Sequence, residues 1–493
     1  MALTRKRKIL LGVATGCLSY LSLGSAATYT TGTEVPTGTE LVLTAGDVVN
    51  ITVPSGENQV AGFSASGAGT SLVINGTQMV GNGNNLLSVV NVDSGASLTI
   101  TEGTNITTGL GAGHWEIVRV AGAGTEASIT GATLGGNTSE QGVHLEENSR
   151  TVIKDTTINT SDSVYGNVVQ SGAFLDADGL IINNYQGTLS GRALLVVSSG
   201  ATLKNSHIYS EIGVGLGISD ESTVSFTDGT ITTTGDEAHG LRASDEGTVL
   251  ELGNGTVKTS GEYAVGIWVS DSAVGTVEDY EVTTEGTNAY GILAYGAEAE
   301  LILNRGSVET SGDKAYGFFV GSTAVGTATD MEITTSGENA YGVYVSGAAT
   351  GNATNAKIIT SGVSAAGIVV SGASVGNLAD SEITTSGSLA HGAAITTGGG
   401  TLNISNSVIE VTSNDAVGLR LNDSTLGSTN AQIANIANSH IESTGVAISQ
   451  NNGEATIEIS EGSVVEGGTY LLNVGAQGKT VLNAKSGSQL IGD

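Results

Sequence analysis

The sequence predicts an all-β protein, a single-stranded right-handed parallel β-helix (a solenoid) with about 25 residues in each coil. Three observations lead to this fold class. A unit of 25 or 26 residues repeats along the chain, each unit is rich in Val, Ile and Thr and interrupted by Gly, and apolar positions alternate with variable ones. The composition agrees, because 74 glycines and only 2 prolines accompany a hydrophobic content of 39%, enough to build a core.

The repeat is most regular between residues 231 and 421, within a repetitive region of about 215–421. A glycine column marks the units at spacings of 25 or 26: Gly240, Gly266, Gly291, Gly317, Gly342, Gly367, Gly392 and Gly418. An apolar column keeps the same phase: Ile231, Val257, Val282, Val308, Ile333, Ile358, Ile383 and Ile409. A unit of this length fits one coil of about three short strands, whereas a propeller blade needs roughly 40 residues.

Local pattern places the strands inside each unit. The residues after each column glycine alternate between apolar and variable, as in Ile292, Leu293 and Ala294. A period of two is typical of a strand with one buried face. β-branched residues bounded by Gly favour short strands joined by turns, and no useful apolar stripe of helical period competes with them.

Residues 1–27 are predicted to be a signal peptide, and residues 28–493 the exported β-helix. Four basic residues precede a mostly apolar stretch, and the small residues after it place cleavage after Ala26 or Ala27. The only cysteine is Cys17, inside the signal. An exported chain without cysteine suits passage through a second membrane in an unfolded state, and equally suits a repetitive core that needs no disulfides.

The charge of the chain narrows the range of partners. The formal net charge is −31, and removal of the signal peptide, with four basic and no acidic residues, makes it −35. Nucleic acid and anionic lipid both need a cationic surface, so we expect neither as a partner. Beyond residue 28 no stretch resembles a membrane-spanning helix.

Several features together resemble pertactin-like autotransporter passenger domains: the signal, the cysteine-free coils, and phrases such as Val-Asp-Ser-Gly-Ala at 92–96 and Ile-Thr-Thr-Ser-Gly at 333–337. The resemblance implies type V secretion, a place at the outer-membrane surface of a Gram-negative bacterium or outside the cell, and a role in adhesion, self-association or virulence. Such proteins end in a translocator barrel. This sequence lacks that pattern, so we expect a passenger fragment whose barrel lies elsewhere.

The search for catalytic chemistry predicts no enzyme, no catalytic residue, no metal site and no cofactor. The pairs Asp176/Asp178 and Glu298/Glu300 are interpreted as solvated positions, and Ser94 has no accompanying protease domain. None of the six histidines has metal-ligand spacing: His114, His144, His207, His239, His391 and His440. Two alternatives to an adhesin remain open, a β-helix polysaccharide-degrading enzyme and an inert stalk.

The variable position after each column glycine suggests a binding surface. By strand parity its side chains point outward, and stacked coils make a contiguous apolar stripe from Trp268, Leu293, Phe319, Tyr344 and Val369. A second ladder just before the glycine consists of Tyr290, Tyr316 and Tyr341, whose facing the sequence leaves open. We expect this face to bind a host surface protein, a glycan or another copy of the chain, unless a loop covers it or the tyrosines only stack together.

Overall fold

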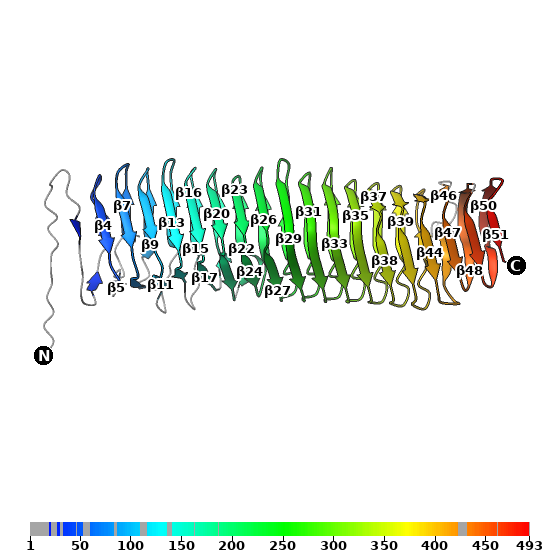
Figure 1. Ribbon diagram of the computed structural model, residues 1–493, viewed down its shortest axis with the longest axis horizontal. Helices are drawn as coiled ribbons and strands as arrows, with labels where there is room; N and C mark the ends of the chain where they lie inside the picture. The colour runs from blue at the N-terminus through cyan, green and yellow to red at the C-terminus, as the bar shows by residue number, and fades with distance from the viewer. Residues whose placement is uncertain are drawn as a thin grey trace.

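The computed structural model describes most of the chain as one long rod of stacked coils (Figure 1). The described residues are 19–20, 27–29, 33–45, 47–52, 60–82, 86–108, 116–135, 141–161, 163–185, 187–422, 431–460 and 462–492. Over these ranges the chain forms strands, turns and bends and no helix. The predicted signal peptide lies almost entirely outside them, so its boundary stays a prediction.

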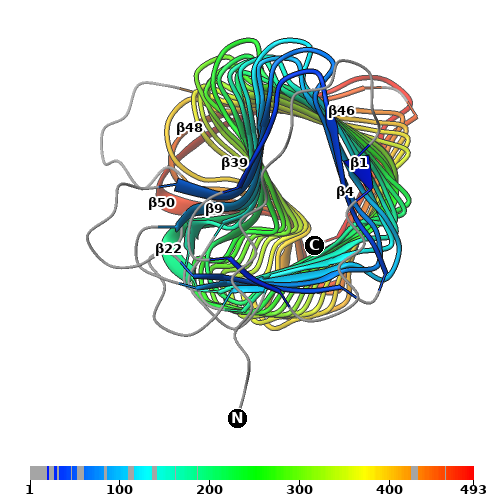
Figure 2. The same ribbon diagram turned by 90° about the vertical axis from the view of Figure 1, so that its left-hand side faces the viewer.

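All strand pairs are parallel, and each strand pairs with strands about 25 residues away on either side. Seen along the rod, the strands of successive coils superpose into ladders that enclose a common interior (Figure 2). The predicted class, an all-β parallel solenoid with about 25 residues per coil, is therefore confirmed.

Three ladders make up the solenoid. The first contains β1 (Ser19–Tyr20), β4 (Glu40–Leu43), β7 (Ser71–Ile74), β10 (Ser97–Ile100), β13 (Glu126–Thr130), β16 (Arg150–Lys154), β20 (Phe174–Asp178), β23 (Gly200–Lys204), β26 (Thr223–Thr227), β29 (Val249–Thr259), β31 (Val274–Thr284), β33 (Glu300–Thr310), β35 (Val325–Thr335), β37 (Thr350–Thr354), β40 (Val375–Ala379), β43 (Thr401–Ser405), β46 (Gln432–Ala437), β48 (Val446–Ile459) and β50 (Tyr470–Ala484).

The second ladder contains β2 (Ala27–Tyr29), β5 (Val48–Thr52), β8 (Gln78–Asn82), β11 (Asn105–Thr108), β14 (Thr133–Leu134), β17 (Thr157–Thr160), β21 (Ile181–Asn184), β24 (His207–Ser210), β27 (Thr230–Thr233), the second halves of β29, β31, β33 and β35, and then β38 (Lys357–Thr360), β41 (Glu382–Thr385), β44 (Val408–Val411), β47 (His440–Ser443), β49 (Val464–Gly467) and β51 (Gln489–Ile491).

The third ladder contains β3 (Thr33–Val35), β6 (Val60–Ser66), β9 (Leu86–Asp93), β12 (Glu116–Ala121), β15 (Gln141–Glu146), β18 (Ser163–Tyr165), β19 (Val168–Gln170), β22 (Gly187–Val197), β25 (Val214–Ser219), β28 (Leu241–Ala243), β30 (Ile267–Ser270), β32 (Ile292–Gly296), β34 (Phe318–Ser322), β36 (Val343–Gly347), β39 (Ile368–Gly372), β42 (Ala393–Ile395), β45 (Val417–Leu421) and the first halves of β48 and β50.

The core runs through the middle of the rod as columns of like residues. On the third ladder Ile292, Phe318 and Val343 are direct partners in adjacent coils, and all are buried. Each inward apolar side chain therefore packs on its equivalents above and below, which explains the strict apolar columns of the sequence.

The column glycines permit the close approach of neighbouring coils. A Cβ atom on Gly291 would lie 2.7 Å from the carbonyl oxygen of Gly317 and 2.3 Å from a methyl group of Val308. Any side chain there would push coils apart, so the column is glycine for lack of space rather than for a left-handed backbone. This tight turn leads directly into the strands that carry the predicted site.

Buried threonines fix the turn before each of these strands. The hydroxyl of Thr284 donates to the carbonyl oxygen of Ala289 at 2.7 Å, and the same bond recurs coil after coil. The threonines that donate it are all fully buried: Thr233, Thr259, Thr284, Thr310, Thr335, Thr360 and Thr385. A buried carbonyl left unpaired is unfavourable, so this column holds the turn geometry.

A third feature that stabilises the coils, after the glycines and the threonines, lies at the corner between the first and second ladders. Residues there have left-handed backbones, which Asn and Asp tolerate better than most residues. Asp330 has φ 55°, Asn355 has φ 50°, and the amide of Asn355 donates to the carboxylate of Asp330. Arg305 occupies the same corner with φ 53°, and its guanidinium binds Asp279 instead. Side chains thus tie each corner to the next.

Candidate partner-binding surface on the third ladder

The outward positions of the third ladder form one continuous column along the rod. Its members in successive coils are Asn91, Arg119, His144, Val168, Leu195, Gly217, Arg242, Trp268, Leu293, Phe319, Tyr344, Val369, Ala394, Arg420, Ser449 and Asn473. The five residues of the predicted apolar stripe occupy consecutive places in it. The structure therefore brings them together, as strand parity predicted.

The tyrosine ladder lies beside this column, outside the core. Tyr290 and Tyr316 stack at 5.0 Å between ring centroids with an interplanar angle of 4°, and Tyr316 and Tyr341 stack at 4.9 Å and 2°. Each ring is half-buried. The facing that the sequence left open is thus settled as outward, with ring faces turned to each other and ring edges toward the outside.

The two columns contact each other through their rings. Phe319 meets the Tyr290 ring edge-on at 5.3 Å and 90°, and Tyr344 lies 4.9 Å from Tyr316 and 5.0 Å from Phe319. Tyr295, which the sequence analysis missed, joins them at 6.1 Å from Phe319 and is 46% exposed. We call these six residues the aromatic cluster: Tyr290, Tyr295, Tyr316, Phe319, Tyr341 and Tyr344.

The expectation of an exposed stripe is wrong for two of its members. Leu293 is 6% exposed and Val369 2% exposed. Leu293 lies between the large rings of Trp268 and Phe319 in the adjacent coils. Val369 packs with two alanines against Tyr341 and Tyr344. The small members of the stripe thus lie beneath the rings, and the rings of Trp268, Phe319 and Tyr344 are half-buried.

Burial keeps the ladder hydroxyls protonated. It raises the pKa of Tyr290 above the usual tyrosine value, with the neighbouring Tyr344 adding to the shift. Burial likewise raises the pKa of Tyr316 and of Tyr341. The tyrosine ladder therefore presents neutral hydroxyl groups over the physiological pH range.

Arg242 and Trp268 lie on the N-terminal side of the aromatic cluster, in the same outward column. The Arg242 guanidinium lies over the Trp268 ring at 4.5 Å from its centroid, a cation–π contact. His239 meets the same ring edge-on at 5.0 Å. Burial, with the charge of Arg242, lowers the pKa of His239 to about 4, so this imidazole is neutral at pH 7.

A polar cluster that the sequence analysis missed lies nearer the N-terminus of the same ladder. The Arg119 guanidinium binds the Glu146 carboxylate, and His144 Nδ1 lies 2.7 Å from Glu116. Gln170 contacts both His144 and Glu146. Burial opposes ionisation of Glu146, but the charges of His144 and Arg119 outweigh it and lower the pKa of that carboxyl. Pairing across coils creates this cluster, so no local motif revealed it.

The carboxylate pairs named in the sequence do not converge on a site. Asp176 and Asp178 point outward along β20, and Asp178 accepts a hydrogen bond from Asn205 of the next coil. Glu298 is an exposed turn residue with φ 54°. Ser94 also lies in a turn, with φ 56°. His114 lies outside the described residues, and among the described ones no three His, Cys, Asp or Glu side chains group as metal ligands.

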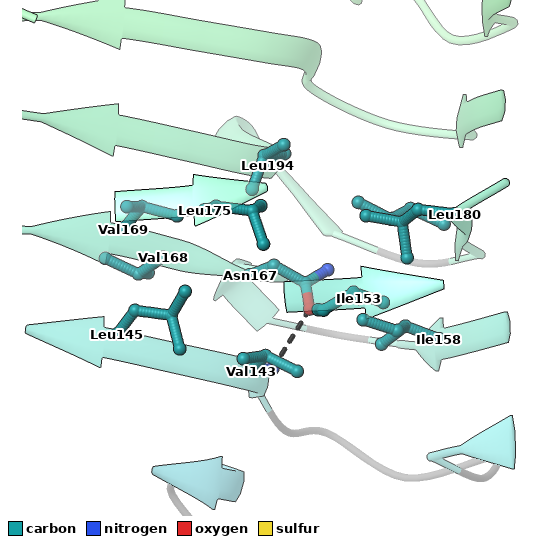
Figure 3. Close-up of a pocket in the computed structure, with 11 residues that line it drawn as sticks. Val143, Leu145, Ile153, Ile158, Asn167, Val168, Val169, Leu175, Leu180 and Leu194 are labelled. Carbon is teal, nitrogen blue, oxygen red and sulfur yellow. Dashed lines mark hydrogen bonds between the residues drawn. The ribbon is translucent and has the colours of Figure 1, made fainter. Parts of the chain in front are cut away.

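The cavity drawn in Figure 3 belongs to the core rather than to a binding site. Its volume is about 10 Å³, room for at most one water molecule. The Asn167 side chain accepts a hydrogen bond from the Val143 N–H at 3.0 Å (Figure 3). It also donates one to the Ala193 carbonyl at 3.0 Å. The larger hollows lie outside, on the third ladder.

Comparison with known proteins identifies the fold. No protein-family profile and no curated protein sequence matches the chain. The cryo-EM structure of the Vag8–C1 inhibitor complex is similar over 95% of this chain and 99% of that chain, with a TM-score of 0.50 and 13% sequence identity. Vag8 is an autotransporter passenger with a pertactin-like β-helix, and this chain is similar to it in fold.

Two alginate epimerases align less well. The A-module of the Azotobacter vinelandii mannuronan C-5 epimerase AlgE6 has 12% identity over 86% of this chain and 90% of that chain, with a TM-score of 0.24. The periplasmic alginate epimerase AlgG has 10% identity over 96% and 78%, with a TM-score of 0.15. Scores this low say nothing about activity.

Among the described residues, no helix is present that could cross a membrane.

Proposed function

We propose that this chain is the passenger of an autotransporter that acts in adhesion or self-association through the aromatic cluster. In this proposal the chain is exported through the inner membrane and reaches the outer-membrane surface of a Gram-negative bacterium or the medium. The pertactin-like fold, the predicted signal peptide and the cysteine-free coils support the export route. The aromatic cluster, with its Trp268 end, supports the binding role.

The observation that carries the proposal is the gathering of rings on one outer face. Aromatic residues are 4% of the chain, yet six lie together outside the core. Protein interfaces are enriched in Tyr, Trp and Arg, which combine apolar area with a polar tip and dominate binding energy. A passive stalk has no need of such a surface.

Charge ranks the partners within this proposal. With a net charge of −35 after signal cleavage, two copies repel each other at long range, most strongly at low ionic strength. A host surface protein or glycan that carries fewer negative charges than a second copy is repelled less. Adhesion is therefore favoured over self-association, and Vag8, whose structure holds C1 inhibitor, is an example of this fold bound to another protein.

The polar cluster around Glu116, Arg119, His144 and Glu146 supports a second candidate function, that of a polysaccharide-degrading enzyme. Two glutamates, an arginine and a histidine converge there, the groups that such chemistry uses. Their charges are mutually paired, however, and a general acid needs a raised rather than a lowered carboxyl pKa. Depolymerisation of uronate polysaccharides by the purified chain, abolished by Glu116→Gln, would establish this alternative.

Sedimentation separates adhesion from self-association. We would compare purified residues 28–493 with a variant carrying Trp268→Ser, Phe319→Ser and Tyr344→Ser over a wide concentration range at low and high salt. Association of the parent chain, lost in a folded variant, assigns the cluster to self-recognition. A parent that stays monomeric throughout rules out homotypic binding and leaves adhesion or a stalk.

A further inference from the structure

A groove of about 590 Å³ opens on the third ladder where the tyrosine ladder stops. Its wall at that end is Tyr341, and Ala366 and His391 follow in the next two coils, as backbone hydrogen bonds show: Gly342 N–H donates to the Ala366 carbonyl and Gly367 N–H to the His391 carbonyl, both at 3.0 Å. The volume lies within the range of small-ligand sites, about 300–1,000 Å³.

The two ends of the tyrosine ladder differ in what fills them. At the N-terminal end the ladder position is Val265, and the Trp268 ring of the same coil occupies the space against His239. At the C-terminal end the corresponding residues are Ala366 and Val369, with Ala394 beyond, and all three are buried at the bottom of the groove. One ring is therefore missing from the series.

Neighbouring side chains partly cover the place of the missing ring, because Tyr341 and Tyr344 pack on the buried Ala366, Val369 and Ala394. Tyr341 and His391 lie two coils apart, about 9.6 Å at the usual strand spacing. Rings one coil apart in this ladder stack at 4.9 to 5.0 Å. The open part of the groove lies outside these buried residues and is bordered by Tyr341, His391 and Arg420.

The rest of the groove is lined by hydroxyl and amide groups. Among these donors and acceptors are Asn339, Ser364, Thr396, Asn414 and Asn473. Amides both donate and accept, which matches the hydroxyl groups of a sugar. The Asp415 carboxylate also lines the groove, but it accepts hydrogen bonds from Ser388, Ser413 and Leu389.

Arg420 gives the groove a positive charge with unmatched donors. Its Nη1 lies 2.9 Å from His391 Nε2, while His391 Nδ1 accepts the Val417 N–H at 3.1 Å. A neutral imidazole accepts at one nitrogen only, so both contacts cannot be hydrogen bonds at once. Within the described part of the chain, Arg420 forms no ion pair with an Asp or Glu.

We propose that this groove binds a saccharide, with a carboxylate-bearing pyranose ring beside the half-buried Tyr341 and its carboxylate on Arg420. The C–H face of a pyranose carries partial positive charge and packs on the negative face of an aromatic ring. A guanidinium pairs with a carboxylate in a two-pronged geometry. The inference rests on the proposed adhesive function and names the chemistry of its partner, which either an acidic polysaccharide or a terminal sialic acid supplies.

Titration calorimetry tests this with three probes: tetragalacturonate for the polymer, 3′-sialyllactose for the terminal sugar, and lactose as the neutral reference. We expect one acidic probe to bind at least tenfold more tightly than lactose. Ala366→Tyr fills the missing ring position and Arg420→Gln removes the charge, and each should weaken that binding at least tenfold. Ala348→Tyr adds the same ring at an exposed turn outside the groove and should leave binding unchanged.

Two results would overturn the site. One is equal or absent binding of all three probes, and the other is a folded Ala366→Tyr chain that binds as the parent does. Far-ultraviolet circular dichroism of each variant confirms the β-helix. Attachment of the same variants to host cells keeps the two proposals apart, because attachment that survives Ala366→Tyr retains adhesion and removes only this groove.

Discussion

At the residue scale, the sequence predicts which side chains share a column but not how much of each column remains accessible. The placement of Trp268, Phe319 and Tyr344 in one column follows from strand parity, because equivalent positions meet in adjacent coils. The burial of Leu293 does not, since it depends on the size of the side chains above and below it. Tyr295 was missed because only the first outward position of its strand was considered.

Loss of one buried threonine hydroxyl should destabilise the rod. Thr335→Val removes the donor to the Ala340 carbonyl and leaves that acceptor buried and unpaired, which costs about 1–3 kcal/mol. Chemical denaturation measures the change. Thr334→Val, on the outward side of the same strand, is the matched control and should change stability by less than about 0.5 kcal/mol. Equal effects of the two substitutions would refute the role given to the threonine column.

Two histidines should make stability depend on pH. Burial, with the charges of Arg242 and Arg420 respectively, lowers the pKa of His239 and of His391 to about 4, against 6.5 for the free side chain, and Asp415 only partly opposes the shift at His391. The unfolded chain therefore binds more protons below pH 6.5, so stability is present above that pH and falls as pH drops toward 4.

The denaturation midpoint, measured from pH 7.5 to pH 4, tests this. The parent should lose more stability over that window than the variant His239→Gln/His391→Gln, because the variant lacks both groups. Carboxylates that titrate near pH 4 are common to both chains and cancel in the comparison. Parallel pH profiles would show that neither imidazole is held neutral by the fold.

At the element scale, the regular coils were predictable and the irregular ones were not. The glycine column and the apolar column keep one phase between residues 231 and 421, and the strands follow them. Nearer the N-terminus the spacing varies, and strand pairing alone places Glu116, His144 and Glu146 together. Contacts between coils that differ in length leave no periodic trace in a single sequence, which is why the polar cluster was missed.

The column glycines give an element-scale prediction. A Cβ atom added at Gly342 would lie 2.3 Å from the Ile358 side chain and 2.6 Å from the Gly367 carbonyl oxygen. Gly342→Ala should therefore lower the unfolding free energy by about 3 kcal/mol or more, since adjacent coils must separate. At Gly253 the nearest atom is a Thr227 methyl at 3.3 Å, so Gly253→Ala needs only a small shift of that side chain and should cost far less than Gly342→Ala. Thermal unfolding of both variants measures the difference.

At the scale of the whole molecule, composition and repeat length were enough to predict a solenoid, because few folds repeat every 25 residues with Gly and β-branched residues. The identity of the binding partner, in contrast, could not be predicted from the repeat. Recognition depends on the few side chains that break the repeat, such as Trp268 and Arg420, and their meaning comes only from their neighbours in the assembled rod.

Export is the first whole-molecule prediction. Expressed in a Gram-negative host with its own N-terminus, the chain should be cleaved after Ala26 or Ala27, because a basic segment, an apolar segment and small residues precede that point. N-terminal sequencing of the periplasmic or surface fraction reads the cleavage site. An intact Met1 in an exported chain would contradict the assignment of residues 1–27.

The central claim, that the aromatic cluster recognises a partner, is tested most directly by attachment of residues 28–493 on beads to host cells. The account predicts attachment by the parent and loss of at least tenfold in the Trp268→Ser/Phe319→Ser/Tyr344→Ser variant. A matched control removes three exposed apolar side chains from the other ladders, Val274→Ser/Val325→Ser/Val408→Ser, and should attach normally. Attachment by the parent that survives the aromatic triple substitution would contradict the claim.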